Sequence, residues 1–167
     1  MKKLTLAAVA VTALFAASPA FATSTKDFVG KASQSGMFEI ESSKLALTRA
    51  TDPEVKTFAQ KMIDDHTAAS AALKAAMAAD GVDMSLAPAA LDKKYASKLE
   101  DLQEADAEDF DEDYMDMQKS AHRKAVRLFK DYADDGENAA LKTFAASTVA
   151  TLEAHKEHAK KLEAKVD

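Results

Sequence analysis

The sequence predicts an all-α protein built from long helices. Of its 167 residues, only 4 are glycine and 3 are proline, which is too few for the many turns of an all-β fold. Alanine, the strongest helix former, is abundant throughout the chain. Four long segments also carry apolar or small residues at every third or fourth position, which is the spacing of amphipathic helices.

Residues 1–22 have the three parts of a secretory signal peptide. Lys2-Lys3 supplies a positive start, the apolar run Leu4–Phe15 follows, and Ala20-Phe21-Ala22 is the small-x-small pattern that signal peptidase recognises. The apolar run is too short for a transmembrane helix, which needs roughly 20 residues. We therefore expect Sec-type export to a periplasm or another external compartment, with residues 23–167 as the mature domain. An uncleaved N-terminal anchor is the alternative.

Start and stop signals bound each helix of the mature chain. The first helix is expected over Asp27–Arg49. The second opens at Asp52-Pro53, where a capping residue precedes proline at the first helical position, and it stops at Gly81. The third is expected over about Asp109–Ala133 and the fourth over about Glu137–Val166, with a glycine in the turn between them.

The lengths of the connections predict how these helices are arranged. Ala50 and Thr51 are nearly all that separates the first two helices, so those helices must be antiparallel neighbours, and the third and fourth are joined as tightly. The stretch Gly81–Glu108 is long enough to run the length of a bundle, and Ala89–Gln103 within it is expected to form a short helix. Two antiparallel hairpins joined by one such crossover form a ferritin-like four-helix bundle.

The histidines and one glutamate are the most informative polar residues. The four histidines all fall inside predicted helices: His66, His122, His155 and His158. Glu39 interrupts a stripe of small residues on the first helix, where a carboxylate is costly unless it is paired or bound to a cation. Counting from the turns, with a rise of about 1.5 Å per residue, places Glu39 and His66 within roughly 3 Å in height. The same count leaves His122 and His155 roughly 7 Å apart in height.

Three imidazoles and one carboxylate that converge near mid-bundle would suit Zn, Cu, Ni or Fe. We therefore predict a transition-metal site formed by Glu39, His66, His122 and His155. In the alternative interpretation, each histidine is a core-edge residue that is hydrogen bonded to a neighbour such as Asp65 or Tyr114. His158 is expected on the solvent side.

Three further residues are expected to surround this site. A ligating imidazole usually donates its other N–H to a carboxylate or a carbonyl. Asp65 points about 100° round the helix from its sequence neighbour His66, so it should serve a histidine on an adjacent helix. Tyr114 lies two turns before His122 on nearly the same face. Met62, one turn before His66, offers a thioether that could join it in binding Cu(I).

Several classes of function are excluded by what the sequence lacks. No Glu-x-x-His pair occurs, so a di-iron centre is not expected. The absence of cysteine removes disulfides and thiolate metal sites. A net charge of −6 argues against nucleic acid as a partner. Charges are spread through every helix of the mature chain, which argues against a transmembrane segment there, and no catalytic constellation marks an enzyme.

Motifs along most of the mature chain point to a family. They are Gly36-Met37-Phe38-Glu39-Ile40, then Met62-Ile63-Asp64-Asp65-His66, then Phe110-Asp111-Glu112-Asp113-Tyr114 followed eight residues later by His122, and finally His155. Together they resemble an exported ferritin-like family catalogued as domain of unknown function 4142. The resemblance runs from about Asp27 to Leu162. It implies a ferritin-like four-helix fold and an envelope location, with a glutamate in the first motif, and the family has no settled activity.

The function predicted from these features is metal binding without catalysis, as metal buffering or as an envelope stress role. The alternative is a structural, interaction or stress-protective bundle of the cell envelope. In that case the histidines are structural, and the acidic face could form an oligomer interface.

Overall fold

The computed structural model describes residues 23–166, and all regular structure in that part of the chain is helical. The elements are α1 (Thr25–Arg49), α2 (Pro53–Ala79), the 3-10 helix η1 (Met84–Leu86), α3 (Lys93–Glu104), α4 (Phe110–Asp135) and α5 (Ala139–Val166). The prediction of an all-α protein is confirmed. The predicted signal peptide, residues 1–22, lies outside the described residues.

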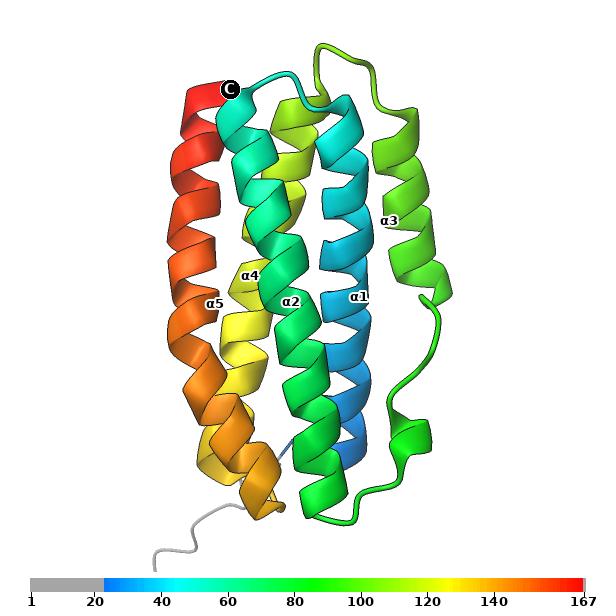
Figure 1. Cartoon of the computed structure of the whole chain (residues 1–167), viewed down its shortest axis with the longest axis vertical. Coiled ribbons are helices and arrows are strands. Elements are labelled where there is room, and N and C mark those ends of the chain that lie inside the picture. The colour runs from blue at the N-terminus through cyan, green and yellow to red at the C-terminus, as the bar shows by residue number, and fades with distance from the viewer. Residues whose placement is uncertain (1–22, 167) are drawn as a thin grey trace, which may run out of the picture.

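Four long helices lie side by side, and α3 packs on the outside of α1 (Figure 1). α1 contacts α2 and α4, while α5 contacts the same two helices from the other side. Figure 1 shows that α1 and α5 run in one direction and that α2 and α4 run in the other. The connection that contains η1 and α3 returns along the length of the helices, so α4 starts at the same end as α2. Within residues 23–166, no helix combines the length and the apolar character needed to cross a membrane.

The short helix of the crossover begins later than the sequence predicts, at Lys93 rather than at Ala89. Asp92 is its N-cap, because the Asp92 carboxylate accepts a hydrogen bond of 2.9 Å from the backbone N–H of Tyr95. The preceding residues are held as a loop by Gln34 of α1. Its side-chain Nε2 donates to the Ala90 carbonyl and its Oε1 accepts from the Asp92 N–H, both at 2.9 Å.

Two carboxylates, the buried Asp111 and the half-buried Asp80, connect the ends of the long helices through hydrogen bonds. The Asp111 carboxylate, in the first turn of α4, accepts hydrogen bonds from the backbone N–H groups of Thr51 and Asp52, which form the turn between α1 and α2. At the opposite end, the Asp80 carboxylate accepts from two backbone N–H groups in the first turn of α5. Each carboxylate thereby satisfies donors that a helix start or a turn leaves without partners.

The apolar core is divided into two clusters by a layer of buried polar residues. One cluster gathers around Phe28, Phe129 and Tyr132, and the other around Phe58 and Tyr114. On each long helix, one buried titratable residue lies between the segments that contribute to the two clusters; these residues are Glu39, His66, His122 and His155. The two cores therefore hold this layer from both sides.

Candidate metal centre

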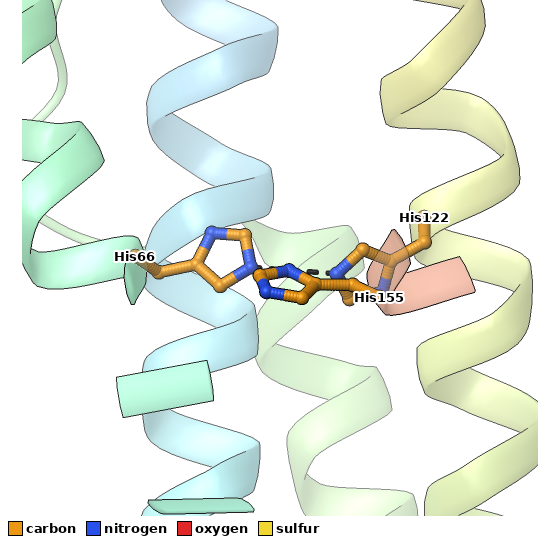
Figure 2. A group of neighbouring side chains, drawn as sticks. All are labelled: His66, His122 and His155. Carbon is orange, nitrogen blue, oxygen red and sulfur yellow. Dashed lines mark hydrogen bonds between the residues drawn. The ribbon is translucent and has the colours of Figure 1, made fainter. Parts of the chain in front are cut away.

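Three histidines from three helices meet at the middle of the molecule. His66 comes from α2, His122 from α4 and His155 from α5, and Figure 2 shows their rings pointing toward one another. The ring centroids are 5.5 Å apart for His66 and His122, 5.7 Å for His66 and His155, and 5.2 Å for His122 and His155. One nitrogen from each ring lies within 4.8 Å of the other two. All three side chains are buried.

Glu39 of α1 joins this group through His66. Its Oε2 lies 2.8 Å from His66 Nε2, and its Oε1 lies 3.9 Å from His122 Nδ1. The contact with His66 has the distance of an ion pair but not the angle of a good hydrogen bond, since Oε2 has no hydrogen-bond partner among the described residues. The Ser35 hydroxyl donates weakly to Oε1, at 3.4 Å. Glu39 is 1% exposed, so this charge depends on its neighbours for stabilisation.

The hydrogen bonds around His122 and His155 fix which ring nitrogen carries the proton when each ring is neutral. His122 Nδ1 lies 2.8 Å from the Gln118 carbonyl, and because a carbonyl only accepts, Nδ1 donates and Nε2 keeps its lone pair. That Nε2 lies 3.4 Å from His66 Nε2. His155 Nε2 donates to the Asp65 carboxylate at 2.7 Å, which leaves a lone pair on Nδ1. His155 Nδ1 is buried and has no hydrogen-bond partner among the described residues.

The protonation of the four groups follows from their burial and mutual contacts. Burial alone would raise the pKa of Glu39, but the three neighbouring histidines outweigh it and lower this pKa to about 2. Burial would lower the pKa of His66, whereas the Glu39 carboxylate raises it above the usual value. Burial lowers the pKa of His122, and burial together with the charge of His122 lowers that of His155 to about 4. At neutral pH the metal-free site therefore holds an ionised Glu39 and neutral rings at His122 and His155.

The metal-free protein should lose stability as the pH falls from about 6.5 to about 4. In this range the unfolded chain protonates His155 near its usual pKa of 6.5, while the folded protein resists protonation until about pH 4. The unfolded state then binds more protons, so acidification favours unfolding. At about 1.4 kcal/mol per unit, and allowing for some access of water, we expect a loss of about 2 kcal/mol from His155. Urea unfolding in the presence of a chelator, repeated at several pH values, measures it.

The His155→Asn variant should show a flatter pH dependence over this range, whereas His158→Ala should keep the slope of the parent. If the free energy of unfolding depends on pH equally in all three proteins, the pH dependence does not come from His155. Glu39 acts over a lower range: its stabilising contribution is present above about pH 4.5 and disappears as the pH falls through about 2.

Of the three residues expected to surround the site, Asp65 alone is hydrogen bonded to a histidine in the described part of the chain. Asp65 bonds His155 across the α2–α5 interface, and its carboxylate also pairs with Lys61 at 2.7 Å. The Tyr114 hydroxyl bonds the Ser43 hydroxyl at 2.8 Å, and no hydrogen bond joins Tyr114 to a histidine within residues 23–166. An orienting role for Tyr114 stays a prediction. Met62 is fully buried in the core cluster around Phe58. His158 is exposed, which confirms the expectation that it lies on the solvent side, and its ring packs edge-on against Phe58.

Two features of the site were not found by sequence reasoning. Gln118 is fully buried, its carbonyl orients His122, and its side-chain Nε2 donates to the Ser42 hydroxyl at 3.0 Å. Its position four residues before His122 was the available signal, since a helical residue faces the one four positions on. The second feature is a cavity of about 40 Å³ that Glu39, His66 and His155 line together with small and hydroxylated side chains.

These observations define a helical protein with a buried cluster of three histidines and one glutamate between two apolar cores. The chain belongs to the family described as "Domain of unknown function (DUF4142)", whose model matches residues 10–162. The family resemblance seen in the sequence motifs is thereby confirmed.

Comparison with solved structures and with curated proteins gives two further results. The fold is similar to that of a structure described as "CopM in the Cu(II)-bound form", with a TM-score of 0.68 and 16% sequence identity. The similarity covers 85% of this chain and 97% of that one, and at this identity it shows a shared fold. No curated protein matches the sequence.

Proposed function

We propose that this protein is an exported, ferritin-like four-helix bundle that binds a transition metal ion through Glu39, His66, His122 and His155. Its role is metal buffering or protection of the envelope under metal stress, without catalysis. The observation that carries the proposal is the convergence of one nitrogen from each of three buried imidazoles within 4.8 Å.

The outer hydrogen bonds of two rings support this proposal. His122 donates from Nδ1 to a backbone carbonyl and His155 donates from Nε2 to a carboxylate. Such bonds typically orient ligating histidines and raise the basicity of the opposite nitrogen. The buried and unpartnered Nδ1 of His155 is also unusual, because buried polar atoms nearly always have a partner. A cation would give that lone pair a partner.

Copper(II) is the first metal to test. Imidazole nitrogens and a carboxylate suit several transition metals, and copper(II) binds most tightly to a given set of such ligands. The structurally similar CopM is described in its Cu(II)-bound form, which supports the same choice. Bound copper would supply positive charge beside the buried Glu39 carboxylate.

The ferritin-like assignment is supported by the directions of the helices and by the long crossover between α2 and α4. The di-iron chemistry of that fold is not part of the proposal, since the buried cluster contains only one carboxylate, from Glu39. Export is supported by the sequence of residues 1–22 alone.

Two contacts favour a second candidate, in which the histidines are structural. His155 is bonded to Asp65 and His66 is paired with Glu39, so both rings have protein partners without any metal. In that case the polar layer links the four long helices, and the protein acts as a structural or interaction bundle of the envelope.

Metal titration of protein made without an affinity tag separates the two candidates. His66→Ala should weaken copper(II) binding at least tenfold, because it removes one of the proposed ligands. His158→Ala is the matched control and should change the affinity less than twofold, since His158 is exposed and lies outside the cluster. If no transition metal binds the parent protein more tightly than micromolar, the structural candidate is favoured.

A further inference from the structure

A second hollow lies between α1, the crossover and α4. It has a volume of about 650 Å³, within the range of pockets that hold small organic molecules. Its walls include Gln34 and Ser35 of α1, Tyr95 of α3 and Leu128 of α4. We refer to it as the crossover groove.

Lysines from three helices line the crossover groove. Lys26 and Lys31 come from α1, Lys94 from α3 and Lys124 from α4. Of these, Lys31 is paired with Asp27 at 3.5 Å, and the others have no carboxylate partner within the described part of the chain.

This concentration of positive charge is unusual in a chain whose net charge is −6. Besides Asp27, the groove is lined by one other carboxylate, Asp92. The Asp92 carboxylate caps α3, where it accepts a hydrogen bond from the backbone N–H of Tyr95. Lys94, Lys98 and Arg123 lie close enough to Lys124 for their positive charges to act on it. The mutual repulsion of these cations is relieved when an anion lies among them.

The groove also has apolar surface and a fixed wall. Leu86, Pro88, Leu128 and the ring of Tyr95 line it beside the lysines. Its crossover side is held by the two hydrogen bonds that Gln34 makes with the loop before α3. The Tyr95 ring in turn packs against Phe38 of α1, with the ring centroids 5.2 Å apart. Charged groups beside apolar surface match a ligand that has both an anionic group and an apolar body.

We infer that the crossover groove binds a small organic anion, with its anionic group beside Lys94 and Lys124 and its apolar body along Leu86 and Leu128. The site is distinct from the histidine cluster and does not depend on metal binding. Two side chains, Ser35 and Ala125, line both this groove and the small cavity beside Glu39, so the two spaces are neighbours.

Isothermal titration of the full chain with decanoate, at low ionic strength and with a chelator present, tests this inference. We expect saturable binding of one decanoate, and at least tenfold weaker binding by the double variant Lys94→Gln/Lys124→Gln. The matched control is Lys74→Gln/Lys160→Gln, which removes the same charge from exposed positions on α2 and α5. The control should bind decanoate within twofold of the parent.

Two more ligands test whether both the charge and the apolar chain of decanoate contribute to its binding. Decanol, which has the same chain without the charge, should bind at least tenfold more weakly than decanoate, and so should inorganic phosphate. The inference is overturned if decanoate does not bind, if both double variants weaken binding equally, or if decanol or phosphate binds as tightly as decanoate. Metal binding by the histidine cluster is measured separately, so failure of one site does not decide the other.

Discussion

Copper(II) at a thousandfold excess over its dissociation constant should stabilise the protein against unfolding by about 4 kcal/mol. A ligand that binds only the folded state stabilises it by mass action, and the size of the effect depends on the ratio of ligand concentration to Kd. The cluster takes one residue from each of α1, α2, α4 and α5, so unfolding must disperse it. For a chain of this size, roughly 2–4 °C per kcal/mol gives an expected rise in Tm of about 8–16 °C.

Thermal unfolding followed by circular dichroism at the helical band, with and without a chelator, measures this shift. A triple variant, His66→Ala/His122→Ala/His155→Ala, should show no copper-dependent change, whereas His158→Ala should retain the full shift. If the triple variant is stabilised by copper as strongly as the parent, the ion binds elsewhere and the proposed site is wrong.

The helices were the part of the structure that the sequence determined best. Asp52 and Pro53 mark the start of α2 in the structure as in the sequence, and Gly81 follows its end with a φ of 65°. These signals are local, because a cap or a left-handed glycine acts on its own turn. The start of α3 was misplaced because it depends on Gln34, a residue of another helix that holds the preceding loop.

The convergence of the four polar groups followed from helix periodicity, but their contacts did not. Counting residues from the turn at about 1.5 Å per residue predicts that His122 and His155 lie roughly 7 Å apart along the helix axes. In the structure the centroids of their rings are 5.2 Å apart, partly because the last helix begins at Ala139 rather than at Glu137, which shortens the count from the turn to His155. The partner of the Tyr114 hydroxyl is Ser43 of α1. Such a pairing depends on how two helices are rotated against each other, which one sequence does not reveal.

Replacing the cluster one residue at a time should have the opposite effect from replacing all of it. His66→Leu alone should destabilise the metal-free protein by about 3–5 kcal/mol at neutral pH, because it leaves the buried Glu39 carboxylate without the imidazole that it contacts at 2.8 Å. The fourfold variant Glu39→Met/His66→Leu/His122→Leu/His155→Leu removes every charge of the cluster and fills the layer with apolar side chains. Buried ion pairs replaced in this way often leave a protein as stable as before, or more stable by about 1–4 kcal/mol.

Urea unfolding of the parent, the single variant and the fourfold variant, all in chelator, gives both differences in free energy. A fourfold variant that is at least as stable as the parent, yet shows no copper-dependent rise in Tm, would mean that the cluster costs stability and is kept for its ligand. That is the outcome we expect, because the two apolar cores on either side of the layer already join the four long helices. If the fourfold variant instead loses several kcal/mol, the contacts of His155 with Asp65 and of His66 with Glu39 hold the helices together, and the structural role of the histidines is the correct one.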